Sequence, residues 1–394
     1  MLSLDKVFDA QTVLKNIVRE TKLVRAYGIA PDCELYLKPE NLQITGSFKV
    51  RGSAYKIAML TDEEKGVIAC SAGNHAQGVA LAATKNGIKS LICLPDSAPI
   101  SKVEATKGYG AEVCLVEGCY DDAYRKALEL RDREGYTFVH PFDDENVIAG
   151  QGTIALEILN DLDNIDAIVV PIGGGGLISG IAYTVKQIRP SVKVYGVQAA
   201  GAPSMYNSVK DGEIECLSSV STIADGIAVK KPGENTFRYV REYVDEVALV
   251  TDDEVSSAIL ALIEKQKMIA EGAGATAVAA VMFDKFHLKG KRVVAVVSGG
   301  NIDVTSLSRV IDRGLLKSGR SSSLLIELID KPGQLKEISR IIADCGGNVT
   351  GVHYEKGNTE SVNGCFLRIE METRDFEHVN LITQSLRCEG FKLI

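Results

Sequence analysis

The stretch Ala167-Ile168-Val169-Val170-Pro171-Ile172-Gly173-Gly174-Gly175-Gly176-Leu177 decides the fold. Its first four residues are all apolar, which is typical of a parallel strand buried on both faces. Four glycines follow, although a tight turn from a strand to a helix needs only one or two. Because glycine is costly in chain entropy, the run indicates that backbone N–H groups approach a ligand closely. At the start of a helix such groups bind phosphate, so we predict an α/β fold with a phosphate site here.

The glycine run differs from the two common nucleotide motifs. The sixth position counted from Gly173 is Ile178, whereas the dinucleotide motif requires glycine there. No Gly-Lys-Ser/Thr follows, so the loop of nucleoside triphosphatases is also excluded. The sequence therefore predicts a phosphate site that serves neither a dinucleotide nor a nucleoside triphosphate.

Apolar runs of strand length recur along the first 312 residues, and segments of helix length separate them. These runs are Val67–Cys70, Ser90–Leu94, Ala111–Val116, Ala167–Val170, Val192–Val197 and Arg292–Val297. Between them, Asp122–Arg133 and Val255–Met268 carry apolar residues at helical spacing. The alternation predicts parallel sheets covered by helices on both faces, with residues 1–312 forming one α/β region.

The composition changes after residue 312. Residues 313–323 are polar and contain glycine and serine, so we interpret them as a linker. Residues 324–394 then follow the order strand, helix, strand, strand, helix, strand, which is the ferredoxin-like βαββαβ unit. A unit of this size has a limited core, which favours pairing with another copy.

Composition places the chain among soluble globular proteins of the cytoplasm. It has 394 residues, 45% of them hydrophobic and 24% charged, with a formal net charge of −8. This charge argues against binding to nucleic acid or to an anionic membrane, and no apolar run is long enough to span a bilayer. The N-terminal residues do not resemble a signal peptide. The nine cysteines form no Cys-x-x-Cys pair, so we expect reduced thiols and no structural metal.

A second candidate element is Thr45-Gly46-Ser47-Phe48-Lys49-Val50-Arg51-Gly52. Lys49 lies between Phe48 and Val50, and apolar surroundings lower the pKa of an amine and suit it to form a Schiff base. Most lysines beside an apolar residue simply extend into solvent. Lys49 therefore becomes informative only together with the other motifs.

Two further motifs follow predicted strands. In Ser71-Ala72-Gly73-Asn74-His75-Ala76-Gln77-Gly78, N–H groups at a helix start can hold a carboxylate, and the Asn74 side chain can bind a ring hydroxyl. Ser71 or Asn74 could instead only cap the helix, and we interpret the His75 side chain as structural. The motif Ser298-Gly299-Gly300-Asn301 places a hydroxyl at the carboxyl end of a strand, where α/β proteins bind ligands. The same residues could also form an ordinary turn without a ligand.

Together the four motifs resemble the fold type II pyridoxal-phosphate enzymes of the serine/threonine dehydratase branch. The resemblance covers residues 1 to about 312 and implies two doubly wound α/β domains, the smaller (about 45–145) inserted in the larger. It implies that Lys49 holds the cofactor as a Schiff base and later moves protons. The other roles it implies are ring packing by Phe48, ring-hydroxyl binding by Asn74, phosphate binding by Gly173, Gly174, Gly175, Gly176 and Leu177, a contact of Ser298 with the pyridine nitrogen, and binding of the substrate carboxylate by Ser71, Gly73, Asn74 and His75.

Two differences separate this chain from the serine racemases that it resembles. Those enzymes have a second serine where this chain has Ala72, so we expect slow racemisation. They bind a divalent metal through Glu-x-x-x-Ala-x-Asp, whereas the matching stretch here begins at Gln198 and ends at Ser204. A hard divalent cation prefers anionic oxygen ligands, so we predict that no divalent metal binds there.

The C-terminal unit resembles an ACT domain, a small module that senses amino acids. The resemblance rests on Asp330-Lys331-Pro332-Gly333-Gln334-Leu335 and Gly346-Gly347-Asn348-Val349. It implies a homodimer or homotetramer that binds an effector such as isoleucine or valine. The alternative is a module that serves only oligomerisation.

We therefore expect a pyridoxal-phosphate enzyme that converts L-threonine to 2-oxobutanoate and ammonia by β-elimination, with L-serine as a secondary substrate. The neutral Ser298 hydroxyl would not keep the pyridine nitrogen protonated, which suits prompt β-elimination. Two alternatives are a serine-preferring dehydratase or racemase, and a non-catalytic amino-acid sensor on the same fold. A sensor has no need of the Schiff-base lysine.

Overall fold

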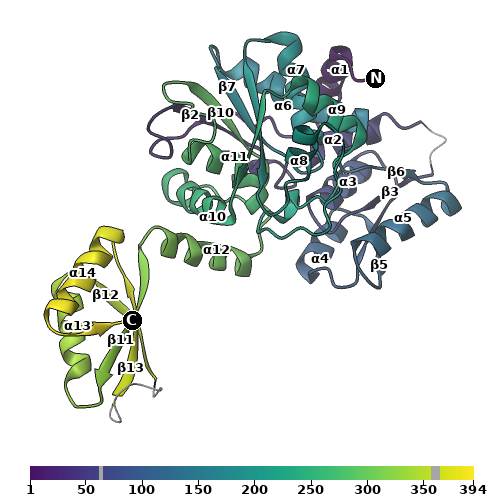
Figure 1. Ribbon diagram of the computed structural model, residues 1–394. Coiled ribbons are helices and arrows are strands. Elements are labelled where there is room, and N and C mark those ends of the chain that lie inside the picture. The colour runs from purple at the N-terminus through teal and green to yellow at the C-terminus, as the bar shows by residue number, and fades with distance from the viewer. Residues whose placement is uncertain (62–64, 356–363) are drawn as a thin grey trace. The chain divides into compact units, whose positions relative to one another are not determined.

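The computed structural model describes residues 1–61, 65–355 and 364–394. The chain divides into two compact units, Met1–Asp303 and Val304–Ile394, and each is described by itself (Figure 1). The predicted α/β region and the predicted antiparallel C-terminal sheet are both confirmed.

The larger sheet of the first unit has six strands in the order β1-β2-β10-β7-β8-β9. Its strands are β1 (Val24–Arg25), β2 (Glu34–Pro39), β7 (Ala167–Pro171), β8 (Lys193–Ala199), β9 (Glu246–Val250) and β10 (Arg292–Val297). β1 pairs with β2 antiparallel, and all the other neighbours pair in parallel. β7 is central and buried along its whole length, which explains its unbroken apolar sequence.

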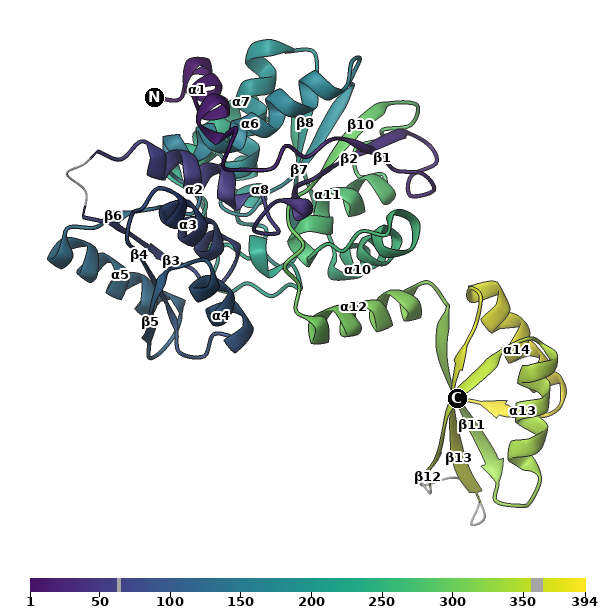
Figure 2. The same cartoon turned by 180° about the vertical axis from the view of Figure 1, so that it is seen from behind.

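Helices cover both faces of this sheet (Figure 2). Apolar residues of α6 (Glu145–Asp161), α7 (Gly176–Ile188) and α9 (Glu234–Tyr243) share one core with β7, β8 and β10. α10 (Asp252–Ala261) and α11 (Gly272–Met282) lie on the opposite face, where α11 packs on the central strands. The sheet is thus held between two helical layers, as parallel sheets require.

The smaller sheet is parallel throughout, with the strand order β5-β4-β3-β6. Its strands are β3 (Val67–Cys70), β4 (Ser90–Pro95), β5 (Glu112–Val116) and β6 (Thr137–Phe138). α5 (Tyr120–Glu134) packs on one face, and α3 (Asn74–Lys85) and α4 (Ile100–Gly108) pack on the other. α2 (Lys49–Ala58) contacts both α3 and α6, so it links the helices of the two sheets.

The remaining elements of the first unit are short or peripheral. They are α1 (Leu4–Leu14), η1 (Glu40–Leu42), α8 (Ser204–Asp211), η2 (Asp225–Ile227) and a π-helical turn, η3 (Leu262–Gln266). The π turn continues α10, and Lys267 ends it with a positive φ of 57°. The helix expected over Val255–Met268 therefore changes its hydrogen-bond pattern halfway.

The second unit contains an antiparallel sheet of strand order β12-β13-β11-β14, which is the ferredoxin-like order. Its elements are α12 (Val304–Lys317), β11 (Ser321–Ile329), α13 (Gln334–Asp344), β12 (Asn348–Glu355), β13 (Gly364–Glu372), α14 (Phe376–Cys388) and β14 (Lys392–Leu393). α13 and α14 share one core with the strands. α12 extends into the segment 313–323 that we interpreted as a linker, and β11 begins at Ser321.

Two features are absent from the described residues. No helix in the described ranges is both long enough and apolar enough to cross a membrane. Within the same ranges, no group of three or more His, Cys, Asp or Glu side chains is arranged to hold a metal ion.

Candidate active site

A cavity of about 1130 Å³ opens where β3, β7 and β10 of the first unit end. The carboxyl ends of parallel strands are the usual binding edge of α/β sheets. All the site residues that the sequence predicted line this cavity: Phe48, Lys49, Ser71, Gly73, Asn74, His75, Gly173, Gly174, Gly175, Gly176, Leu177 and Ser298. The fold thus brings together loops that are more than two hundred residues apart in the chain.

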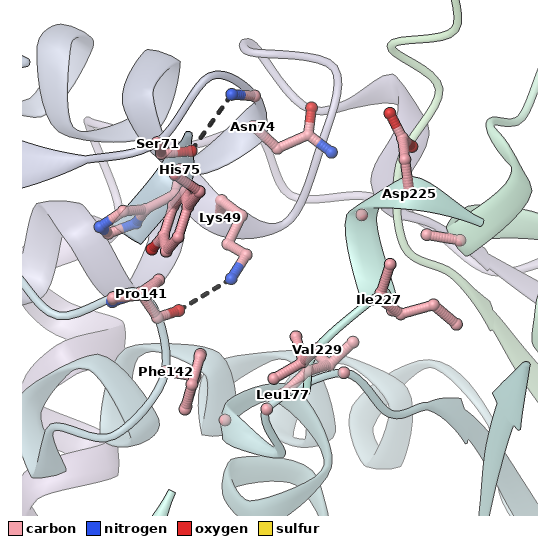
Figure 3. A pocket seen from close by; sticks show the side chains of 18 of the residues that line it. Lys49, Ser71, Asn74, His75, Pro141, Phe142, Leu177, Asp225, Ile227 and Val229 are labelled. Carbon is pink, nitrogen blue, oxygen red and sulfur yellow. Dashed lines mark hydrogen bonds between the residues drawn. The ribbon is translucent and has the colours of Figure 1, made fainter. Parts of the chain in front are cut away.

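Lys49 is the first residue of α2, and its side chain reaches into the cavity (Figure 3). Its Nζ donates a hydrogen bond to the carbonyl oxygen of Pro141 at 2.8 Å and lies 5.3 Å from the centre of the Phe48 ring. Burial lowers the pKa of the Lys49 amine to about 8, although Glu271 acts in the opposite direction. The neutral, nucleophilic fraction of this amine near neutral pH is therefore far larger than that of an ordinary lysine.

The segment before Lys49 is joined to the end of β10. The Phe48 N–H donates to the Ser298 carbonyl at 3.1 Å, and Ser47 forms an isolated bridge with Gly299. The Ser298 side chain is buried, and its hydroxyl donates to the Ala273 carbonyl at 3.4 Å. These bonds bring the lysine and the serine to one wall of the cavity.

The glycine loop forms another wall of the cavity. Helix α7 begins at Gly176, so the N–H groups of its first turn have no acceptor within the helix. Gly175 has a φ of 99°, which strongly favours glycine. A Cβ atom on Gly174 would lie 2.4 Å from a carbon of the Phe142 ring. The Thr236 hydroxyl donates to the Gly174 carbonyl at 2.6 Å and holds the loop in place.

The loop after β3 borders the cavity opposite Leu177 and Phe142 (Figure 3). The Gly73 N–H donates to the Ser71 hydroxyl at 3.1 Å. His75 is buried, and its Nε2 lies 2.8 Å from the Val139 carbonyl oxygen. Burial, helped by the nearby Lys49, lowers the pKa of His75 to about 3, so its imidazole is neutral. The His75 side chain therefore brings no positive charge to the cavity.

Sequence reasoning missed Glu271, which lines the same cavity. Its side chain is only 5% exposed, and its Oε1 accepts a 2.7 Å hydrogen bond from Asn74 Nδ2. Burial, with a contribution from Asp225, raises the pKa of Glu271 to about 7. The signal in the sequence was a lone acid inside the apolar stretch Met268–Ala273.

Asn301 also lines the cavity and was missed as a site residue, although the quoted motif Ser298–Asn301 contains it. Its Nδ2 donates to Asn74 Oδ1 at 2.8 Å and to the Thr45 carbonyl at 2.7 Å. Asn74 is thus held from two sides by residues that follow it by about two hundred positions.

These observations fit pyridoxal phosphate. The cavity offers an amine with a lowered pKa, and the unpaired N–H groups at the start of α7 suit a phosphate. The glycine loop fits its walls only without Cβ atoms, which leaves the backbone open to a ligand. The volume slightly exceeds the usual range of small-molecule sites, so a cofactor and a substrate can share it.

Comparisons with known proteins agree with this site. Residues 14–299 match the family model described as "Pyridoxal-phosphate dependent enzyme". The chain belongs to this family of pyridoxal-phosphate-dependent enzymes.

The relatives narrow the assignment within the family. The L-threonine ammonia-lyase of Thermotoga maritima is 48% identical, and the match covers 100% of this chain and 99% of the relative. Among solved structures, threonine deaminase isoform 2 of Solanum lycopersicum is 38% identical with a TM-score of 0.75, covering 78% of this chain and 93% of that one. Maize serine racemase is 35% identical with a TM-score of 0.74, covering 80% and 98%. The full-length match places the chain in the threonine ammonia-lyase branch.

Proposed function

We propose that this chain converts L-threonine to 2-oxobutanoate and ammonia with pyridoxal phosphate bound at Lys49. The observation that carries the proposal is the amine of Lys49, which faces the cavity with a pKa of about 8. The full-length similarity to an L-threonine ammonia-lyase supports threonine as the substrate.

Bound pyridoxal phosphate supplies an aldehyde that condenses with amines and a ring that withdraws electrons from the substrate α-carbon. Lys49 would hold the aldehyde through its Nζ, and the same amine, once free, would accept the α-proton of the substrate. The Pro141 carbonyl accepts a hydrogen bond from the same nitrogen and so orients it. Because burial lowers the pKa of this amine, it can act as a base near neutral pH.

The walls of the cavity orient the two ligands. The N–H groups of Gly173–Gly176 and Leu177, which line the cavity, would bind the phosphate, and the Phe48 ring would pack against the cofactor. The Ser298 hydroxyl would face the ring nitrogen, and because it carries no charge it would not hold that nitrogen protonated. The loop Ser71–His75 binds the substrate carboxylate through backbone N–H groups, since the His75 imidazole is neutral and turned to Val139.

The test is a visible spectrum of the purified protein before and after L-threonine is added, with 2-oxobutanoate assayed in parallel. We expect a band from bound cofactor that changes on mixing while the keto acid accumulates. L-serine and D-serine serve as comparison substrates. Faster pyruvate formation from L-serine, or conversion of L-serine to D-serine, would favour the serine dehydratase or racemase alternative. If no absorption band appears even after pyridoxal phosphate is added, the enzyme proposal fails and the non-catalytic amino-acid sensor remains as the alternative.

We also propose that the second unit binds an amino-acid effector, isoleucine or valine, and that the chain forms a homodimer or homotetramer. A hollow of about 200 Å³ beside the turn Ile329–Leu335 and strand β12 supports an effector site. Deletion of residues 318–394 should preserve turnover and abolish the response to both amino acids. A truncated enzyme that still responds would leave oligomerisation as the role of the unit, and analytical ultracentrifugation of both forms tests that role.

All nine cysteines are free thiols in the structure, which supports a location in the reducing cytoplasm.

A further inference from the structure

A chain of hydrogen bonds crosses one wall of the cavity and connects four segments of the chain. It runs from the Thr45 carbonyl through Asn301 and Asn74 to the Glu271 carboxylate. We propose that Glu271 is a positioning residue. Together with Asn301 it orients the Asn74 amide so that the amide presents an N–H donor to the oxygen of the cofactor's ring hydroxyl. The inference rests on the proposed function, since it assumes that pyridoxal phosphate binds in this cavity.

The direction of the chain is set at its Thr45 end. A backbone carbonyl only accepts hydrogen bonds, so Asn301 must turn its nitrogen toward Thr45. The same nitrogen donates to Asn74 Oδ1 at 2.8 Å. If the Asn74 amide were reversed, two NH₂ groups would face each other and neither could accept.

Glu271 sets the direction at the other end. An ionised carboxylate only accepts, so Asn74 must turn its nitrogen toward Glu271 Oε1, which lies 2.7 Å away. Figure 3 shows the Asn74 oxygen pointing away from Lys49 and the nitrogen on the other side of the amide. With one N–H used by Glu271, the second N–H of this nitrogen remains for a ligand. A donor stabilises a ring oxygen that carries negative charge.

The Glu271 side chain is directed toward Asn74 and the Asn301 backbone rather than toward its own helix. Glu271 is the N-cap residue of α11, yet its side chain makes no capping hydrogen bond. It reaches instead to Asn74 at the start of α3, beside the smaller sheet, and the absence of a side chain at Gly299 leaves room for it. A Cβ atom at Gly299 would lie 2.3 Å from Glu271 Oε1. The positive end of the α11 dipole also favours a carboxylate at this position.

Three charged groups act on this carboxyl from the elements around it. Asp225 of η2 raises its pKa, Lys102 of α4 lowers it, and Lys49 of α2 is electrostatically coupled to it. Lys102 and Asp225 also pair with each other at 3.1 Å. With a pKa of about 7, Glu271 changes its charge around pH 7, and protonation weakens its ability to accept from Asn74.

The experiment compares E271Q, E271L and N301D with the wild type, all loaded with pyridoxal phosphate. Glutamine keeps an acceptor for Asn74 and loses the charge, leucine removes the acceptor, and aspartate at 301 cannot donate to Asn74 or Thr45. E134Q, a change at an exposed side chain, is the matched control. The readouts are the dissociation constant of the cofactor and the absorption ratio of its ionised and neutral ring-oxygen forms at several pH values. Circular dichroism checks each fold.

We expect E271Q to keep the wild-type dissociation constant within about threefold and to lose the pH dependence of the ratio near pH 7. E271L and N301D should each raise the dissociation constant by about tenfold, the effect of one lost hydrogen bond, and shift the ratio toward the neutral form. If E271L and N301D both keep the wild-type ratio, the positioning role is overturned while the proposed function stands. If E271Q loses cofactor binding as fully as E271L, the negative charge of Glu271 is responsible rather than its hydrogen bond from Asn74. That outcome also overturns the positioning role. If the wild type itself binds no cofactor, the proposed function fails first and this inference fails with it.

Discussion

Two cations of helix α2, Lys49 and Arg51, lie two residues apart and have opposite surroundings. Lys49 donates to a neutral carbonyl, and burial lowers its pKa to about 8. Arg51 makes two bonds to the Glu40 carboxylate, both at 2.8 Å, and two to Glu157, at 2.6 and 2.9 Å. Burial alone would lower the pKa of Arg51, but these carboxylates outweigh it and raise the pKa.

The difference separates a reactive amine from a structural cation on the same helix. A buried charge with matched partners is fixed in its ionised state, because removing a partner leaves an uncompensated charge. A buried amine without an anionic partner changes its protonation state easily and can therefore react. The ion pairs of Arg51 hold the start of α2 in place. They thereby fix the position of Lys49, which forms no ion pair of its own within the described residues.

The largest effect is expected for Lys49→Ala. Loss of the amine should reduce turnover of L-threonine by at least about 10³-fold, since both cofactor attachment and proton transfer depend on it. Turnover is measured as 2-oxobutanoate formation, and urea denaturation of the apo-protein should show an unchanged free energy of unfolding. Activity near the wild-type level would contradict the proposed mechanism.

Arg51→Met should act on stability. It leaves the buried Glu40 carboxylate and the mostly buried Glu157 carboxylate without their main partner, and such a loss costs about 3–5 kcal/mol of unfolding free energy. Lys38, which also pairs with Glu157, compensates for part of the charge. Urea denaturation is the measurement, and Arg51→Lys is the matched control, with a smaller expected loss because one charge remains. A loss below about 1 kcal/mol for the methionine variant would show that this network does not stabilise α2.

The lowered pKa of Lys49 gives a pH dependence with a definite sign. The amine is protonated below about pH 8 and neutral above it, so the rate at which apo-protein captures pyridoxal phosphate should rise toward pH 8 and then level off. An ordinary lysine, with a pKa of about 10.4, would keep gaining neutral amine well above that point. Stopped-flow absorbance measures the rate. A rate that still rises tenfold per pH unit above pH 9 would contradict the lowered pKa.

Lys56→Met should have the smallest effect. Lys56 is a third cation of α2, pairs with Asp144 at 2.7 Å, and is partly exposed, with 18% and 20% exposure of the two side chains. Because solvent screens such a pair, we expect a loss of at most about 1 kcal/mol in the same urea experiment. A loss as large as that of Arg51→Met would show that partner charge, rather than burial, separates the cations of this helix.

Much of the fold was readable from the sequence because its signals are local. β3, β4, β5, β7, β8 and β10 were each predicted as apolar runs within a few residues of their observed bounds. β2 was missed because it contains Lys38, which is fully buried and pairs with Glu157, 119 positions later. A charged residue interrupts the apolar run by which a buried strand is predicted. When its ion-pair partner is distant in sequence, nothing nearby in the chain indicates that the charge is buried.

The sequence by itself determined the glycine loop, the lysine between two apolar residues and the serine after a strand, since each depends on neighbours along the chain. Only the tertiary structure decided which polar groups meet. Asn74 and Glu271 are 197 positions apart, and Arg51 and Glu157 are 106 apart. Hydrophobic periodicity shows that a residue is buried, but it carries no record of its partner. The protonation states of Lys49 and Glu271 follow from burial and partner together, so they became readable only in the folded chain.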